Sequence, residues 1–158
     1  MLLTNILRDQ EDVVRSLIDD KQIIGRFQNA SEWGPRALGN RSIIFDPRHE
    51  EAKQIVNEVK QREAYRPFAC TVLKENASEY FEMLQLEESP WMSFAIQAKE
   101  KAYDEIPSLV HADGTCRIQT VTQEQNPNYY NLIKAFGDET GTPILFNTSF
   151  NLGGESLV

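Results

Sequence analysis

The stretch TPILFNTSFN, residues 142–151, decides the fold class of this chain. A short apolar run after Pro143 predicts a buried strand over 142–149. Small polar residues follow the apolar run, and they predict a turn there. A buried strand that ends in polar side chains is typical of α/β folds, whose ligand sites lie just past strand ends.

Strand-like and helix-like segments alternate along the rest of the chain. Apolar runs or alternating patterns predict further strands over 22–28, 41–46, 68–73, 93–99 and 116–122. Helical spacing predicts helices over 9–20, from Asp46-Pro47 to about 60, over 76–84, and from Asn126-Pro127 to about Gly137. The interleaving shows no repeat and no low-complexity linker, so we expect one domain of the α/β (α+β) class. Its twisted mixed β-sheet would be flanked by helices.

Two local predictions refine this outline. Asp46 can cap a helix and Pro47 suits a first helical position, so we expect the second helix to begin there. In the last helix, Tyr130, Ile133 and Phe136 fall on one face, which predicts that they are its buried residues.

The bulk composition excludes several classes of protein. The chain has 158 residues, 41% of them hydrophobic, which is enough for one domain with a real core. No apolar run approaches the roughly 18 residues that span a bilayer, and the first residues lack a signal-peptide pattern. We therefore expect a cytoplasmic protein with no membrane partner. Cys70 and Cys116 cannot form a disulfide framework or a four-ligand zinc site, and we expect both to be reduced.

The charge is unevenly distributed. The net charge of −8 makes nucleic-acid binding unlikely. Residues 26–66 hold eight basic and six acidic side chains, so this segment carries +2 and the remainder −10. A local cationic site on an acidic body suits a small anion, although chance clustering would give the same count.

The first polar motif is EWGPRALGNRSI, residues 32–43. Gly34, Pro35 and Gly39 give it a fixed, unusual backbone that could present N–H groups and guanidinium groups to a phosphate. It lacks the P-loop pattern. The motif predicts Arg36 and Arg41 as binding residues, and the alternative is a rigid turn in which they pair with Glu32 and Asp46.

The second motif is KQREAYRPF, residues 60–68. Lys60 lies at a predicted helix end, and Arg66 precedes a proline that favours an extended backbone. From there Arg66 can project from the loop that enters the strand at 68–73. A solvated basic helix end is the alternative, and Arg62 and Glu63 fit that description.

The third motif is HADGTCRIQTV, residues 111–121. Arg117 and Gln119 are two apart in a predicted strand, so they share a face. An arginine there is costly to bury without an anion or a carboxylate. His111 and Asp113 could bind a metal, but a third ligand is missing, so no metal site is predicted.

The fourth motif is FNTSFN, residues 146–151. Its hydroxyls and amides could bind phosphate oxygens or a base edge, with Asn147, Ser149 and Asn151 as candidates. The alternative is a turn that satisfies its own backbone. Together the four motifs resemble a phosphate clamp without a nucleophile, in which catalysis would be positioning and charge stabilisation.

The motifs WGPRALGNRSI, YRPFACTVL, SPWMSF, HADGTCRIQTV and ILFNTSFNLGGESLV occur in an order and spacing similar to one family. The chain resembles the C-terminal domain of NodU/CmcH-type O-carbamoyltransferases over about 22–158. The resemblance implies a YrdC-like domain covering 1–158, as a fragment of a longer two-domain enzyme, truncated at its C-terminus. Departures include Trp33 where the family usually has Phe, and Ser156 where it has Pro.

The resemblance also implies a reaction and its participants. The domain would form carbamoyl-adenylate from ATP and carbamoyl phosphate, with Mg²⁺ accompanying ATP. An N-terminal actin/Hsp70-like domain with its own metal would then transfer the carbamoyl group to a hydroxyl acceptor, which the sequence does not identify. Lys60, Arg66 and Arg117 are the implied catalytic residues, and Ser149 is an implied contact. A docking module without activity and a YrdC-type RNA-modification domain are the alternatives.

Overall fold

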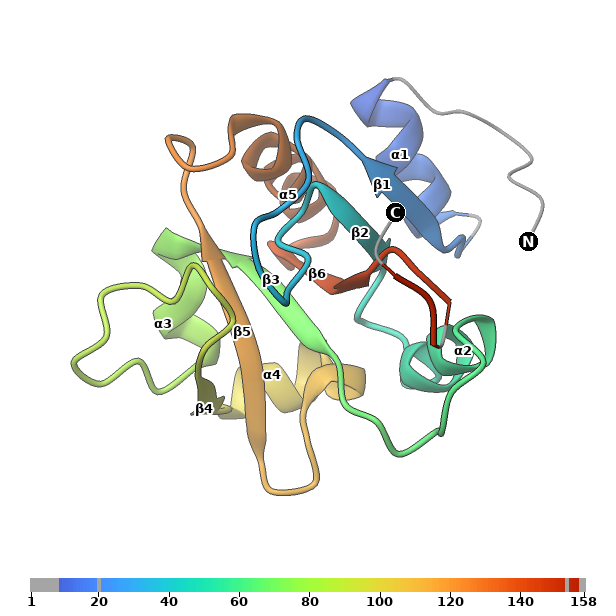
Figure 1. Ribbon diagram of the computed structural model, residues 1–158. Helices are drawn as coiled ribbons and strands as arrows, with labels where there is room; N and C mark the ends of the chain where they lie inside the picture. The colour runs from blue at the N-terminus through green and yellow to red at the C-terminus, as the bar shows by residue number, and fades with distance from the viewer. Residues whose placement is uncertain (1–8, 20, 153, 157–158) are drawn as a thin grey trace.

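The computed structural model describes residues 9–19, 21–152 and 154–156. Both ends of the expected domain, 1 and 158, and position 20 of the first predicted helix lie outside the described residues. Within the described part, strands and helices alternate as expected and form one layered α/β unit (Figure 1). No helix in this part is both long enough and apolar enough to cross a membrane.

The six described strands form one mixed sheet. They are β1 (Ile24–Phe27), β2 (Arg41–Phe45), β3 (Ala69–Leu73), β4 (Ala95–Gln97), β5 (Thr115–Val121) and β6 (Ile144–Ser149). Their order across the sheet is β1-β2-β6-β3-β5-β4. Only β3 and β5 run parallel, and the other neighbouring pairs are antiparallel. The expected mixed sheet is therefore confirmed, with the strand from TPILFNTS at its centre.

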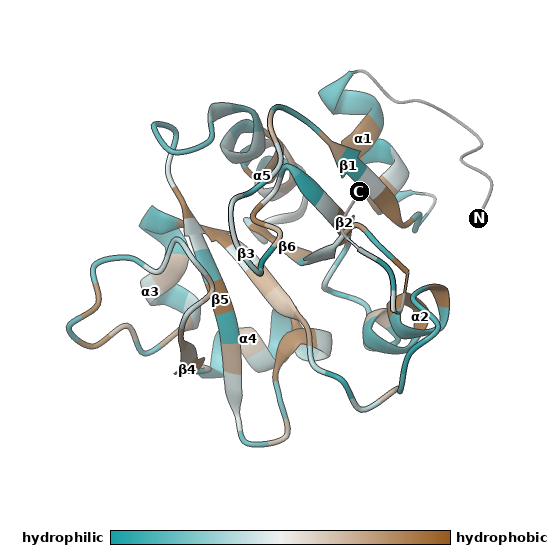
Figure 2. Ribbon diagram, in the orientation of Figure 1, coloured by the Kyte–Doolittle hydropathy of each residue, from teal (hydrophilic) through white to brown (hydrophobic). Residues whose placement is uncertain are grey.

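Helices cover both faces of this sheet. They are α1 (Gln10–Ile18), α2 (Ala52–Val59), α3 (Ala77–Tyr80), α4 (Glu100–Glu105) and α5 (Pro127–Thr140), with short 3-10 turns at Lys74–Asn76 and Pro107–Leu109. One apolar cluster joins α2, α3 and α4 to alternate residues of the strands, Phe146 and Ile118 among them. A second cluster joins α1 and α5 to the opposite face through Leu145 and Ile44. The alternation along β5 is visible as teal and brown bands in Figure 2.

Several local predictions were wrong. Asp46 does not cap α2, which begins at Ala52; its buried carboxylate instead accepts hydrogen bonds from Arg48 Nε at 3.0 Å and Nη2 at 2.7 Å. The helix predicted over 76–84 ends at Tyr80, because Phe81 is extended and bridges to Ala98.

The last helix, α5, does not end at Gly137. It continues to Thr140 and is closed by Gly141 in the left-handed conformation, the usual glycine position after a helix. Its buried face is centred on Tyr129, Leu132, Ile133 and Phe136. Tyr130 is only partly buried, and its hydroxyl bonds to Glu75. A shift of one residue in the helical face explains this difference.

Candidate functional site

The candidate site lies on the sheet face that α5 covers only in part. In the ladder, Ala69 of β3 pairs with Arg117 of β5 on one side and with Asn147 of β6 on the other. Side chains at paired positions share a face, so Arg117 and Asn147 flank a small alanine on the same side of the sheet. Sequence motifs 30 positions apart are thus joined by strand pairing.

A buried hydrogen-bond network extends from this row. Asn147 Nδ2 donates to Thr71 Oγ1 at 2.9 Å and to Gln119 Oε1 at 3.2 Å, and Thr71 Oγ1 also bonds Gln119 Oε1 at 2.9 Å. Gln119 Nε2 donates to the carbonyl of Leu38 at 2.9 Å, and Asn147 Nδ2 lies 3.4 Å from that of Ala37. The network therefore fixes the 32–43 loop onto the sheet, where Figure 1 shows the β1–β2 connection crossing in front of β3.

Hydrogen bonds within the loop, and packing at Gly39, also hold the loop in its conformation. Glu32 Oε1 accepts hydrogen bonds from the N–H groups of Leu38 at 2.8 Å and Asn40 at 2.7 Å. Gly39 has a φ of +112°, and a Cβ placed on it would lie 2.2 Å from the ring of Tyr129. Burial raises the pKa of Tyr129 to about 12, so its ring fills this space as a neutral phenol. A residue with a side chain would not fit at Gly39.

Arg41 and Arg26 hold the base of the same loop. Arg41 is buried, and its Nη1 and Nη2 donate to the carbonyls of Gln28 at 2.7 Å and Asn29 at 3.0 Å. Arg26 Nε donates to the carbonyl of Gly39 at 2.6 Å. The predicted alternative of Arg41 paired with Glu32 or Asp46 is not what the structure has, because its partners are backbone oxygens. Its role as a binding residue stays a prediction.

Arg36 lies in the same loop, and its charge acts on Arg117. Its side chain is exposed, and among the described residues it has no ion-pair partner. Burial lowers the pKa of Arg117, and the positive charge of Arg36 lowers it further. Arg117 Nε is buried without a hydrogen-bond partner in the described part of the chain. Two cations therefore share one location without a neutralising carboxylate, an arrangement that an anion would stabilise.

Lys60, Ser149 and Asn151 form a second, adjoining group. Lys60 is the C-cap of α2 and is buried. Its Nζ donates to the carbonyl of Ser149 at 2.6 Å and to the carbonyl and Oδ1 of Asn151, both at 2.9 Å. Burial, and then the charge of Arg62, lowers the Lys60 pKa to about 8. The ammonium protons are thus already used in holding the end of β6, two residues beyond Asn147.

Arg66 and Arg62 bring two further charges to this end of the sheet. Arg66 is exposed and its Nε pairs with Glu63 Oε2 at 2.8 Å. Arg62 was expected to be solvated, and this was wrong: it is half-buried, and its guanidinium carbon lies 4.0 Å from the ring centroid of Phe68. The signal that could have found Arg62 is its position six residues before an aromatic residue, but that spacing is common.

The third motif also contains residues that make structural contacts in the turn before Arg117. His111 Nε2 lies 3.1 Å from the carbonyl of Phe68, and Thr115 Oγ1 donates to Asp113 Oδ1 at 2.7 Å. These contacts join the 111–115 turn to the start of β3. Within the described ranges no three His, Cys, Asp or Glu side chains gather as metal ligands would. Cys70 and Cys116 are both free and buried.

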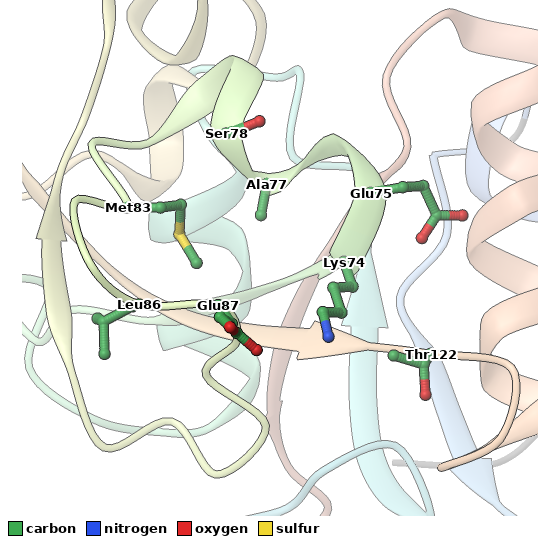
Figure 3. Close-up of a pocket in the computed structure, with 8 residues that line it drawn as sticks. All are labelled: Lys74, Glu75, Ala77, Ser78, Met83, Leu86, Glu87 and Thr122. Atoms are coloured by element: carbon green, nitrogen blue, oxygen red, sulfur yellow. The ribbon is translucent and has the colours of Figure 1, made fainter.

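A separate depression of about 340 Å³ lies away from the arginines (Figure 3). Lys74 and Thr122 lie on one side of it and Met83 and Leu86 on the other. Lys74 pairs with Glu88 at 3.4 Å. None of the residues predicted for the site lines this depression, so the candidate site is the arginine group.

The fold and the site define an α/β domain that gathers positive charge at one end of a mixed sheet, in a chain that is acidic overall. The chain belongs to the family described as Carbamoyltransferase C-terminus, whose model matches residues 15–158. The family resemblance of the motifs is therefore confirmed.

Named relatives extend this finding. The nodulation protein NolO of Bradyrhizobium diazoefficiens is 44% identical, in an alignment that covers 96% of this chain and 29% of the relative. NolNO of Sinorhizobium fredii is 48% identical, over 89% of this chain and 21% of the relative. The 3'-hydroxymethylcephem-O-carbamoyltransferase of Amycolatopsis lactamdurans is 32% identical, over 94% of this chain and 28% of the relative. This chain thus spans less than a third of the length of each.

Proposed function

We propose that this chain is the part of an O-carbamoyltransferase that binds ATP and carbamoyl phosphate and forms carbamoyl-adenylate. The observation that carries the proposal is the grouping of Arg36, Arg66 and Arg117 beside Asn147 and Ser149 in a member of this family. Both substrates are anions, so a site for them needs several cations and few carboxylates. We also propose a cytoplasmic setting, where ATP is available.

Formation of carbamoyl-adenylate at such a site would take two steps. Water cleaves carbamoyl phosphate to carbamate and inorganic phosphate. A carbamate oxygen then attacks the α-phosphorus of ATP, and the bond to the β-phosphate oxygen breaks to release pyrophosphate. Two like-charged reactants must be held together while negative charge develops on the leaving group. Fixed guanidinium groups suit this task, because they are already oriented before reaction.

Each residue would have a distinct task. Arg117, half-buried with an unpartnered Nε, would bind a phosphate oxygen, and Arg36 would close over the same group from the loop. Arg66 would bind from the opposite side by exchanging Glu63 for a phosphate. Ser149 and Asn151 would orient the carbamoyl amide, with Lys60 holding both in place. In this assignment Lys60 acts through its neighbours.

Mg²⁺ would accompany ATP at this site. Magnesium commonly keeps several waters and takes few protein ligands when phosphates are available. This fits a site with no gathered carboxylates among the described residues and with Asn147 Oδ1 as a buried oxygen without a partner there. The ion would supply charge neutralisation to the polyphosphate.

The remainder of the reaction requires a partner. We propose that an N-terminal actin/Hsp70-like domain transfers the carbamoyl group to a hydroxyl. The length of the relatives supports a further region, since this chain matches 29% of NolO and 28% of the cephem enzyme.

Calorimetry of the folded chain with ATP·Mg²⁺ and with carbamoyl phosphate tests the proposal. We expect both ligands to bind, and Arg66→Ala to weaken binding by at least about tenfold, as loss of a charge-assisted contact would. Arg15→Gln is the matched control, because Arg15 lies on α1, is largely exposed, and among the described residues forms an ion pair with Glu11 alone. A folded chain that binds neither ligand contradicts the proposal.

A docking module without its own activity is the second candidate. Fully exposed Trp33, in the same loop as Arg36, supports it, because large exposed aromatic side chains often mark protein contacts. This candidate predicts that Trp33→Ala, and not Arg66→Ala, weakens association with the N-terminal region.

A further inference from the structure

Several exposed apolar side chains belong to the stretch of chain around β4, at one edge of the sheet. β4 is the last strand in the sheet order, and Figure 1 shows the loop that leads into it on the outer side of β5. The large apolar side chains exposed in this stretch are Leu84, Trp91, Phe94 and Tyr103. None of them belongs to the arginine group of the candidate site. Exposed apolar side chains that lie together often mark a protein contact.

The backbone of β4 has an open side next to these side chains. The carbonyl of Phe94 faces β5, because it accepts a hydrogen bond from Ile118 N at 3.4 Å. Backbone groups of successive residues in an antiparallel ladder point in opposite directions, so the N–H and carbonyl of Ala95 point away from β5. Among the described residues no hydrogen bond reaches either group on that side. Unpaired groups at a sheet edge are a template for another strand.

The open stretch is short. Further along β4, the Gln97 carbonyl points the same way as that of Ala95 and accepts from Glu82 N at 2.9 Å. The chain itself therefore covers the edge beyond Ala95. A second strand has room to pair with β4 over one rung of the ladder, so the rest of any contact must come from exposed side chains such as Trp91 and Phe94.

Ala95 lies at the middle of the segment that borders β5. Three contacts hold this segment in place, and they join Ser89 to Thr120, Ala95 to Arg117, and Ala98 to Gly114. Their partners are evenly spaced along the chain. The two outer contacts are therefore about equally far from Ala95.

The two ends of this segment carry opposite charges. Glu87 and Glu88 precede the first of the three contacts, and Lys99 and Lys101 follow the last. Among the described residues Glu87 and Lys99 form no ion pair, so their charges are available. A two-fold axis at Ala95 would place the acidic end of one copy opposite the basic end of another. This charge complementarity of the segment with itself favours a second copy of the chain as its partner.

We propose that the β4 edge is a homodimer contact, in which two copies of this chain meet about a two-fold axis at Ala95. Each Ala95 N–H would donate to the Ala95 carbonyl of the other copy, and Trp91 and Phe94 would be buried beside this rung. The dimer would join two six-stranded sheets edge to edge. It is independent of the proposed function, because no side chain of the arginine group takes part.

Sedimentation velocity of the full chain, from about 1 μM to 1 mM, tests for a reversible dimer. We expect Ala95→Pro to weaken the dimer by at least about tenfold, since proline removes the N–H of the rung and no bond to β5. Phe94→Lys should weaken it similarly by placing a charge in an apolar contact. Each substitution acts twice in a two-fold interface. Trp33→Ala is the matched control, because Trp33 is a fully exposed aromatic residue in the 32–43 loop.

A charge exchange tests the two-fold arrangement. Lys99→Glu should weaken the dimer by roughly threefold or more, because two exposed ion pairs become like-charge pairs. Adding Glu87→Lys to that variant should restore the wild-type affinity. Lys53→Glu on α2 controls for the change in net charge and should weaken the dimer less than Lys99→Glu.

The outcomes that overturn the proposal are specific. A wild-type chain that stays monomeric over the whole series overturns it, and the β4 edge would then belong to a different partner. A dimer that Phe94→Lys and a folded Ala95→Pro leave unchanged overturns it as well, because that dimer uses another surface. If circular dichroism shows that Ala95→Pro is unfolded, Phe94→Lys decides, since Phe94 is already exposed in the single chain. Failure of the charge exchange to restore affinity overturns the two-fold axis at Ala95.

Discussion

Lys60 Nζ lies 2.6 Å from the carbonyl oxygen of Ser149, a residue 89 positions further along the chain. Lys60 ends α2 and Ser149 ends β6, so one ammonium joins the ends of two elements beside the candidate site. The same Nζ also bonds the carbonyl and the side-chain oxygen of Asn151. A buried ammonium group that donates to three backbone and amide oxygens should make the stability of the chain depend on pH.

Wild-type stability should rise relative to Lys60→Met as the pH increases from about 8 to 10.5. The Lys60 pKa is about 8 in the folded chain and 10.5 in the unfolded chain, so over this range the unfolded chain binds the extra proton. The free energy of unfolding therefore increases with pH for the wild type, by up to about 3 kcal/mol relative to the variant. Below pH 8 both states are protonated and the two curves should run parallel.

Urea unfolding of both proteins across that pH range measures this difference. Lys53→Met, on the same helix, controls for the loss of one positive charge from α2. Curves for wild type and Lys60→Met that stay parallel up to pH 10.5 would show that the folded chain does not lower this pKa.

Gly39→Ala should destabilise the chain strongly, by about 3 kcal/mol or more. The new methyl group would lie 2.2 Å from the Tyr129 ring, and the backbone has a φ of +112°. Overpacking and a left-handed backbone each cost roughly 1–3 kcal/mol. Gly34→Ala is the matched control in the same loop: its φ is +141°, but nothing lies within 4 Å of the added carbon. Thermal unfolding should show a clearly smaller loss for Gly34→Ala, and equal losses would refute the packing argument.

Gln119→Leu should cost about 2 kcal/mol, because it removes the hydrogen-bond partner of three groups, the Leu38 carbonyl, Thr71 Oγ1 and Asn147 Nδ2. Gln97→Leu provides the comparison, since its side chain bonds the Gly114 carbonyl at an exposed position. We expect that variant to change stability by no more than about 0.5 kcal/mol. Chemical denaturation measures both, and a loss for Gln97→Leu as large as that for Gln119→Leu would contradict the network's importance.

The strands and the sheet type could be predicted because apolar runs and alternation are local signals. The run around Leu145 is such a case, and its strand lies in the middle of the sheet. Helix ends were less predictable, because they depend on contacts distant in sequence. Asp46 looks like a helix cap, but its carboxylate is buried against Arg48. The helix Glu100–Glu105 was not predicted, since six residues carry too little periodicity.

In the candidate site, too, local sequence signals could be predicted, and contacts between distant residues could not. Arg117 and Asn147 could be proposed from polar residues in apolar strands, but not that both pair with Ala69. The burial of Lys60 and Arg62 could not be predicted, since a basic helix end is normally solvated. Phe68 packs on the Arg62 guanidinium, and the chain returns at Asn151 to accept a hydrogen bond from Lys60.

Arg41→Lys and Arg36→Lys should differ in their effect on stability, although both arginines lie in the same motif. Arg41 is buried, donates to three backbone carbonyls and stacks on Phe27 at 3.5 Å, so lysine cannot replace its planar group. We expect Arg41→Lys to lower the free energy of unfolding by about 1–2 kcal/mol. Arg36 is exposed and makes no such bonds to the described residues, so Arg36→Lys should stay within about 0.5 kcal/mol of the wild type.

Urea denaturation of the two variants under identical conditions distinguishes these roles. A loss confined to Arg41→Lys assigns Arg41 to the framework of the loop and leaves Arg36 free for a ligand. Equal losses would mean that Arg36 also has a structural partner. That result would also weaken its assignment to the phosphate site, because a guanidinium group that is already bonded offers fewer donors to an anion.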